Sequence, residues 1–449
     1  MKTKKLFIGA FILAVGGFIT KILGAIYRVP LAKLLGAEGL GVYQMAFPVY
    51  ALLCEISSAG VPNALARAIS KENDGEEYLI SSLKTFGLIG AILGALLFVF
   101  SREVGVFLGD ENSAFIYKTF APAVALVPLI ASFRGYFQGK LKMYPTAISQ
   151  IIEQVAKITF GILLIKSVDS AKERVIFAGS SVAIAEFFAL IFLVVLFLFN
   201  RKKFVDTFCL LDKDNTLTVS SNLTKKQRRK KIKKALFLSV LPITLLSLTL
   251  PLSQVVDCSI IIRSLSKMRA DAKGIYGVYS GSAMAIINLP VTVCFALATV
   301  AVPAVAKRDG SDKKSVKLLL LSTLVLSILG ALCCYIFSPL AVRLLFSGFS
   351  TEYKSLTVTL IRATSLNVIF SAMLQTINSI LIGVGKTSKA LVGLLVGVIV
   401  KTLLTAILIN FSNLGILVMP ITVTLCNSLA CFINLLYIKK YANKKNNDG

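Results

Sequence analysis

Twelve long apolar runs, separated by short polar gaps, fill nearly all of the 449 residues of this chain. Each run approaches or exceeds the roughly 20 apolar residues that a helix needs to cross a bilayer core. The composition agrees, with 56% hydrophobic residues, 16% charged residues and a mean hydropathy of +0.80. A soluble fold would have too little polar exterior for this much apolar surface. The sequence therefore predicts an all-α, polytopic membrane protein.

The apolar runs set the expected membrane spans. The first run continues past Tyr27 without a small-residue cleavage site, so we expect a span there and not a cleaved signal peptide. The expected spans lie near residues 7–31, 41–69, 79–101, 115–139, 145–166, 174–199, 235–262, 274–306, 315–338, 353–383, 388–411 and 414–438.

The positive charge of the chain is unevenly placed among the loops. The formal net charge is +27, and the segment 201–234 alone holds 12 Lys and Arg against three Asp. Most other cations also fall in the N-terminal tail, the C-terminal tail and alternate loops, which the positive-inside rule assigns to the cytoplasm. We therefore expect a multi-pass membrane protein with both termini in the cytoplasm. The 201–234 segment is expected to contact anionic lipid head groups and not nucleic acid.

The absence of one residue type excludes several kinds of chemistry. The chain contains no His, which excludes His-based acid–base catalysis, Ser-His-Asp triads and His-ligated metal sites. A membrane glycosyltransferase or ligase would also need a large outer loop, whereas the expected outer loops have about a dozen residues at most. We therefore expect a protein that is not an enzyme.

The two halves of the sequence repeat each other. Gly41-Val42-Tyr43 opens the second expected span, and Gly277-Val278-Tyr279 opens the eighth. Lys-Lys pairs before Leu6 and Ala235, and proline motifs at the ends of the second and eighth spans, match in the same order. Because each half has six spans starting on the same side, the halves are expected to be parallel repeats around a central cavity. The predicted units are a lobe at 1–200, a basic linker loop at 201–234 and a second lobe at 235–449.

Ionisable side chains within the spans indicate a cavity or a pairing partner, because they are costly in hydrocarbon. Glu153 and Lys157 are spaced i,i+4, which favours an ion pair within one helix. The remaining charged residues inside spans are Lys21, Arg28, Glu55, Glu186, Asp257, Arg362 and Lys401.

One pair among these follows from the repeat. Arg28 lies 23 residues after Lys5, and Asp257 lies 23 residues after Lys234, so the two hold equivalent positions in the two lobes. We expect them to face each other across the outer mouth of the cavity and to pair when this gate is shut. Glu55 and Asp257 are also candidate ligands for a coupling Na⁺ or H⁺. The membrane potential is the other candidate driving force, and no organic cofactor is expected.

The balance of charge indicates the chemistry of the cargo. Basic residues outnumber the acidic residues at the expected cavity. They are Lys21, Arg28, Arg362 and Lys401 within spans, and Arg263, Lys267, Arg269 and Lys273 in the loop before the eighth span. Such a cavity suits an anionic group such as a pyrophosphate, through charge-assisted hydrogen bonds. An exporter of cationic drugs would instead be lined by carboxylates and aromatic rings.

Several segments carry a resemblance to a known family. The runs Leu34–Pro48, Ser57–Pro62, Arg134–Gly139 and Pro145–Gln154, and the stretch from Tyr276 through Asn288-Leu289-Pro290 to Pro303, resemble the stage V sporulation protein B family of polysaccharide transporters. That family is similar to the MurJ-type lipid II flippases within the MATE-like exporters of the MOP superfamily. The matching segments cover both lobes.

The resemblance implies a two-lobe fold with a central cationic cavity. It also implies transfer of an undecaprenyl-pyrophosphate-linked oligosaccharide to the outer leaflet by alternating access, with Lys21, Arg28 and Asn288 at the substrate. The sequence departs from the MurJ-type pattern, because Glu55 and Ala285 stand near positions where that pattern has further arginines. We also count twelve spans, without two C-terminal spans that such proteins often add. The glycan therefore stays open, and an ion-coupled MATE-type antiporter of small molecules is the alternative function.

Overall fold

The computed structural model describes residues 2–70, 75–211, 225–307, 313–383, 387–412 and 414–447. Throughout these ranges the regular structure is helical, with no β-strand. The first half contains α1 (Lys2–Ser58), α2 (Val61–Ile69), α3 (Gly75–Val99), α4 (Ser101–Leu108), the 3₁₀ turn η1 (Glu111–Ser113), α5 (Ala114–Gly139), α6 (Tyr144–Lys166) and α7 (Ala171–Leu211).

The second half repeats this succession of long helices. It contains α8 (Lys225–Ser247), α9 (Thr249–Met268), α10 (Ala272–Gly277), the π-helical turn η2 (Val278–Ala283), α11 (Met284–Lys307), α12 (Lys313–Leu345), α13 (Thr351–Thr364), α14 (Asn367–Gly383), α15 (Thr387–Phe411), the 3₁₀ turn η3 (Gly415–Leu417) and α16 (Val418–Asn447).

The described helices account for the expected spans. Nine segments are long and apolar enough to cross a membrane, or eleven when each of two bent helix pairs counts as one span. The first of these, Phe11–Ile69, has 59 residues and would be about 90 Å long as one straight helix, far more than one bilayer core. It breaks at Gly36, whose φ of 67° is a conformation that favours glycine. Counted as two crossings, it brings the described residues to the twelve spans predicted, and the all-α membrane fold is confirmed.

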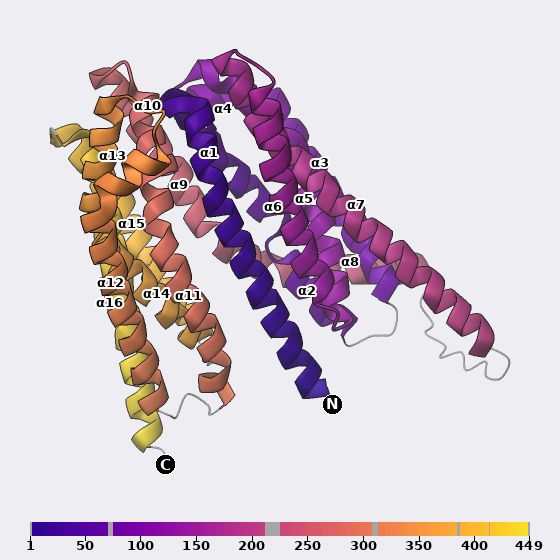
Figure 1. The fold of residues 1–449 in the computed structure, drawn as a ribbon. Helices are drawn as coiled ribbons and strands as arrows, with labels where there is room; N and C mark the ends of the chain where they lie inside the picture. Colours follow the sequence, from indigo (N-terminus) through magenta and orange to yellow (C-terminus); the bar gives the residue numbers. More distant parts are fainter. Residues whose placement is uncertain are drawn as a thin grey trace.

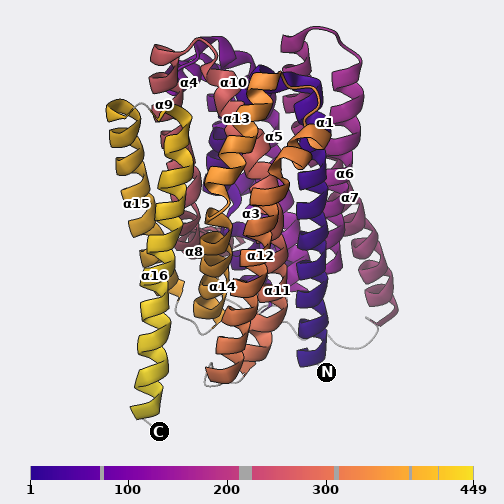
Figure 2. The same ribbon diagram turned by 60° about the vertical axis from the view of Figure 1, so that its left-hand side comes forward.

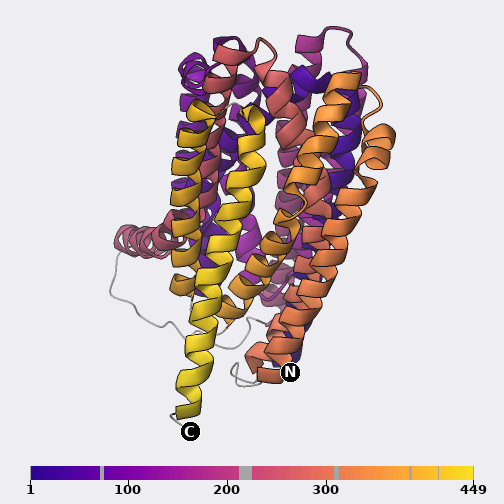
Figure 3. The same cartoon turned by 90° about the vertical axis from the view of Figure 1, so that its left-hand side faces the viewer.

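The helices form two groups that meet at one end of the molecule. Figure 1 shows the first half in indigo and purple and the second half in salmon to yellow, diverging toward the end where both termini lie. Both termini stay at this same end in the turned views of Figure 2 and Figure 3. This placement is the one that an even number of crossings requires.

Two helices pack across the boundary between the halves. The N-terminal helix α1 contacts α9, α10 and α11 of the second half, and α8 packs against α2 and α3 of the first half. Ile232, Leu236 and Val240 of α8 are buried in an apolar cluster made mainly by first-half residues. Because one helix of each half packs against the other half, the interface between the halves is continuous with the apolar core.

The basic segment 201–234 is partly helical. α7 continues to Leu211 and α8 begins at Lys225, so helix occupies both ends of the segment that the sequence predicted to be a loop. Residues 212–224 lie outside the described residues. The difference arises because a run of Lys and Arg is a good helix former and can extend a membrane helix into water. The contact of this segment with lipid head groups stays a prediction.

Candidate functional site

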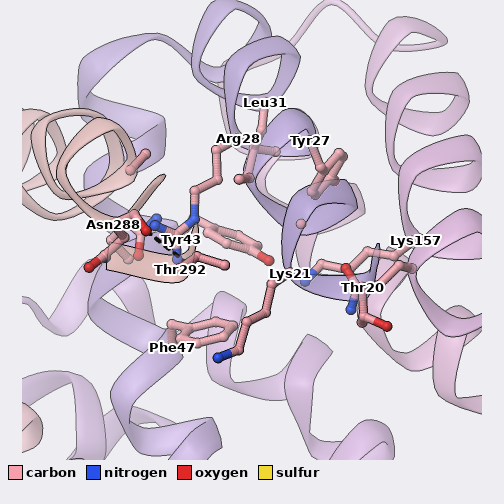
Figure 4. Close-up of a pocket in the computed structure, with 15 residues that line it drawn as sticks. Thr20, Lys21, Tyr27, Arg28, Leu31, Tyr43, Phe47, Lys157, Asn288 and Thr292 are labelled. Atoms are coloured by element: carbon pink, nitrogen blue, oxygen red, sulfur yellow. Dashed lines mark hydrogen bonds between the residues drawn. The ribbon is translucent and has the colours of Figure 1, made fainter. Parts of the chain in front are cut away.

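A cavity of about 400 Å³ lies between the two halves, and α1 and α6 face α11 across it (Figure 4). Residues from α1 and α6 supply most of its wall, and three residues of α11 supply the opposite side. Its lining residues are Thr20, Lys21, Gly24, Ala25, Tyr27, Arg28, Leu31, Tyr43, Gln44, Phe47, Gln154, Lys157, Ala285, Asn288 and Thr292.

Three cations line the first-half wall of this cavity: Lys21 and Arg28 from α1, and Lys157 from α6. Lys21 and Arg28 are seven residues apart, which is close to two helical turns and places them on one face of α1. In the part of the chain that the structure describes, no ion pair involves any of the three. Their charges are therefore available to a ligand.

Aromatic rings lie close to two of these cations. The Lys21 ammonium lies 4.1 Å from the centre of the Phe295 ring. The Lys157 ammonium lies 5.8 Å from the Tyr27 ring and 5.9 Å from the Phe47 ring. A ring face attracts a cation without neutralising it, so these contacts hold the side chains in place and leave the positive potential of the cavity intact.

The second-half wall is neutral. Ala285, Asn288 and Thr292 follow the i, i+3, i+7 spacing that places residues on one face of α11. Figure 4 shows Asn288 and Thr292 approaching the cavity from the side opposite to Lys157. The cavity therefore offers cations on one wall and amide and hydroxyl groups on the other, and none of its lining residues is acidic.

A smaller apolar pocket of about 150 Å³ adjoins the cavity between α1 and α11. It shares Lys21 and Thr292 with the cavity. Its other lining residues are Leu13, Ala14, Gly17, Phe18 and Phe295, all without charge. A molecule that occupied both spaces would thus have an anionic part beside a hydrocarbon part.

Lys157 does not form the ion pair that the sequence predicted. The spacing predicted an ion pair between Glu153 and Lys157, but Glu153 pairs with Arg134 of α5, with 2.9 Å between Nη2 and Oε2. Arg134 also donates from Nε to Ser149 Oγ at 2.9 Å. Because the carboxylate is taken by a neighbouring helix, Lys157 faces the cavity. The one signal in the sequence was a second basic residue, Arg134, in the preceding span.

The gate pair expected from the repeat is also different. Asp257 of α9 pairs with Lys401 of α15 and not with Arg28, which lines the cavity. The expectation of an Arg28–Asp257 contact in a closed outer gate is therefore wrong for this structure. Lys401, expected at the substrate, is buried in the second half beside Asp257 and does not line the cavity.

The remaining predicted site residues lie elsewhere. Arg263 lies against α4, where its Nη2 donates to the Val106 carbonyl oxygen at 3.2 Å. Arg362 is exposed, with its guanidinium 5.5 Å from the Tyr335 ring. Glu55 is half-buried and does not line the cavity. Of the eight predicted site residues, the structure brings together Lys21, Arg28 and Asn288.

The halves are closed against each other at the end away from the termini. A methyl group on Gly277 would overlap the backbone nitrogen of Gly41, and one on Gly41 would overlap the carbonyl oxygen of Lys273. Lys273 also pairs with Asp110 of the first half at 3.1 Å. Because Gly41 and Gly277 are the matching glycines of the two repeats, the halves meet there at equivalent positions, backbone against backbone.

A second set of contacts lies at the same end, between the last turn of α4 and helix α9. Ser259 Oγ donates to the Phe107 carbonyl oxygen at 2.7 Å. The Arg263 side chain lies against the same segment, 5.7 Å from the Phe107 ring. The closed end is therefore held by polar and apolar contacts that separate the cavity from this face of the molecule.

Comparison with known proteins gives relatives over most of the chain. The family model described as "Polysaccharide biosynthesis protein" matches residues 6–309. Stage V sporulation protein B of Bacillus subtilis (strain 168) is 26% identical over 429 residues, covering 91% of this chain and 79% of that protein. Lipid II flippase MurJ of the same organism is 25% identical over 439 residues, covering 91% and 78%.

Solved structures show the same fold. The inward closed conformation of lipid II flippase MurJ superposes with a TM-score of 0.71 at 18% identity, covering 96% of this chain and 87% of that chain. An inward-facing multidrug resistance MATE family transporter of the MOP superfamily gives a TM-score of 0.73 at 13% identity, covering 94% and 95%. The chain thus shares its overall fold with these two transporters.

Proposed function

The chain belongs to the polysaccharide biosynthesis protein family, and we propose that it carries a lipid-linked saccharide with a pyrophosphate group across the cytoplasmic membrane. The single observation that carries this proposal is the cavity wall of Lys21, Arg28 and Lys157, three cations with no carboxylate partner among the described residues. This function is transport and not catalysis. Two relatives, one named a lipid II flippase, support it.

A pyrophosphate fits this wall because of its charge and its many acceptor oxygens. Arg presents a planar fork of donors and Lys a compact cation, and both form charge-assisted hydrogen bonds to phosphate oxygens. The amide of Asn288 and the hydroxyl of Thr292 on the opposite wall suit the hydroxyl groups of a sugar. The adjoining apolar pocket provides the start of a path by which a prenyl chain stays in the bilayer.

The direction of transport follows from the charge of the loops together with the closed end. The positive-inside rule assigns both termini to the cytoplasm, so the end closed by Gly41 and Gly277 would face outward. Substrate would then enter from the cytoplasmic leaflet. Rocking of the two halves would break the Lys273–Asp110 pair and open the outer end.

The fold also supports a second candidate, an ion-coupled antiporter of small molecules. Fold alone does not determine cargo. A cationic drug would need a carboxylate in the cavity, and the lining residues include none. The chemistry of the wall therefore favours an anionic cargo, and a drug-accumulation assay separates the two candidates.

The test is a leaflet-accessibility assay with the purified full-length protein in liposomes. A fluorescent undecaprenyl-pyrophosphate-linked saccharide is placed in both leaflets, and its accessibility to an added reagent is followed in time. We expect protein-dependent transfer that Arg28→Gln and Lys157→Gln each slow at least about tenfold, since each loses a charge-assisted bond.

The matched control is Arg362→Gln, which removes a cation from outside the cavity. It should transfer the lipid at the wild-type rate. Equal slowing by Arg362→Gln and Arg28→Gln, or wild-type transfer by both cavity variants, would contradict the proposal. If a saccharide lipid without pyrophosphate were transferred at the same rate as the pyrophosphate lipid, the cations would not be recognising the anion.

A further inference from the structure

The second half contains a buried ion pair that the transport proposal does not use. Asp257 of α9 and Lys401 of α15 are 3% and 8% exposed, and the Lys401 ammonium contacts Asp257 Oδ2. Both residues lie near the middle of their helices. Ser253, one turn before Asp257, donates to the same carboxylate oxygen at 3.3 Å.

The coordination of this carboxylate is incomplete. Asp257 Oδ1 is buried and has no hydrogen-bond partner in the described structure. One turn from Lys401, Thr405 Oγ1 bonds Thr422 Oγ1 of α16 at 3.0 Å. The carboxylate thus has the Ser253 hydroxyl beside it, and two further hydroxyls lie one helical turn from Lys401. Carboxylate and hydroxyl oxygens are the ligand atoms that hard cations prefer.

Stability alone does not explain such a pair. Replacing a buried ion pair with apolar residues of similar volume often leaves the stability of a protein unchanged or increases it. An ionised carboxylate at this depth requires a positive charge beside it, because a buried anion without a partner is strongly unfavourable. That charge can come from a metal ion taken from solution or from a side chain. Here an ammonium of the chain itself supplies it.

We propose that Asp257 is a monovalent-cation position whose cation is the tethered ammonium of Lys401. It follows that this half remains charge-compensated without Na⁺ from solution, and that the expectation of Asp257 as a Na⁺ ligand does not hold while Lys401 is present. It also follows that removing the ammonium exposes a site for Na⁺. This cation position is independent of the saccharide site.

The experiment compares the purified full-length wild type with Lys401→Ser, which vacates space beside the carboxylate and leaves a hydroxyl oxygen there. Thermal unfolding in detergent is measured in NaCl and in choline chloride at equal concentration, together with binding of radioactive Na⁺. We expect no Na⁺-specific change in Tm for the wild type. We expect a saturable rise of a few degrees and about one bound Na⁺ for Lys401→Ser, because a ligand that binds only the folded state stabilises it.

Two variants separate the site from general effects of the substitution. Lys401→Arg keeps a cation, and the double variant Asp257→Asn/Lys401→Ser keeps the space without the carboxylate. Neither should bind Na⁺. Should Lys401→Ser fail to fold, Lys401→Gln offers the same comparison with a longer side chain.

The opposite results are equally clear. Saturable Na⁺ binding by the wild type that Asp257→Asn removes would show that the carboxylate takes its cation from solution. A folded Lys401→Ser protein that binds no Na⁺ would show that the position is only a structural ion pair. Because saccharide transfer is not the readout, neither result depends on the fate of the transport proposal.

Discussion

The two halves of the molecule hold their membrane-embedded lysines in different ways. In the first half, Lys21 and Lys157 lie against aromatic rings at the wall of the cavity. In the second half, Lys401 is buried against a carboxylate and does not line the cavity between the halves. A charge inside a span therefore does not by itself identify a binding residue. What decides is whether a partner already neutralises it.

The largest effect should come from breaking the pair in the second half. Asp257→Leu leaves Lys401 buried without a counter-charge, and we expect the free energy of unfolding to fall by about 3–5 kcal/mol. Lys21→Met, which removes a cation that has no ion-pair partner among the described residues, should change it by about 0.5 kcal/mol at most. Thermal unfolding of the purified proteins in one detergent measures both.

A double variant shows whether this loss comes from the stranded charge. Asp257→Leu/Lys401→Met replaces both partners with apolar side chains and should recover most of the stability. If the double variant were as unstable as Asp257→Leu, packing and not charge would explain the loss. Charge neutralisation would then not be what distinguishes Lys401 from the lysines of the first half.

A smaller effect should follow from giving the first-half cations a partner. Gln154 lines the cavity on the same helix as Lys157, so Gln154→Glu adds a carboxylate to the positively charged wall. We expect the affinity for farnesyl diphosphate, a soluble ligand with the expected anion, to fall about tenfold, which corresponds to about 1.4 kcal/mol. Isothermal titration calorimetry measures this change.

The matched control for this variant is Gln138→Glu. Gln138 bonds Thr146 at 3.3 Å and does not line the cavity. The same chemical change there should leave diphosphate affinity unchanged. Weakening of equal size by both substitutions would mean that net charge, and not the cavity wall, governs binding.

The smallest effect concerns a paired lysine that is partly in water. The side chains of Lys273 and Asp110 are 35% and 9% exposed, so solvent screens their attraction. Lys273→Met should lower the free energy of unfolding by about 0.2–1 kcal/mol, and added salt should reduce the difference. Both variants are measured in the same unfolding assay. If Lys273→Met lowered the free energy of unfolding as much as Asp257→Leu does, burial would not explain why the two pairs differ.

The fold could largely be predicted from the sequence, because the patterns that determine it are local. A run of apolar residues becomes a membrane helix whatever its neighbours are, and Gly36 gives the chain a break inside a segment of 59 residues. The repeat also predicted which positions are equivalent. Two of these positions, Gly41 and Gly277, lie against each other at the junction of the two halves.

The ion pairs could not be predicted from the sequence, because they depend on how the helices face each other. Glu153 had a basic residue one turn away, yet a neighbouring helix supplied Arg134 at 2.9 Å. Equivalence under the repeat likewise did not make Arg28 and Asp257 contact each other. Residues at equivalent positions of two repeats meet only where both lie close to the axis that relates the repeats, and sequence spacing does not give the distance from such an axis.

The π-helical turn η2 (Val278–Ala283) fixes the rotation of α11 relative to α10. A π turn contains one more residue than an α turn, and each residue of an α-helix advances the chain by about 100° around its axis. Deleting a single residue from η2 would thus swing Ala285, Asn288 and Thr292 away from the cavity together. The polar character of that wall is therefore sensitive to insertions and deletions several residues away, and a relative with a different length there would present other side chains to its cargo.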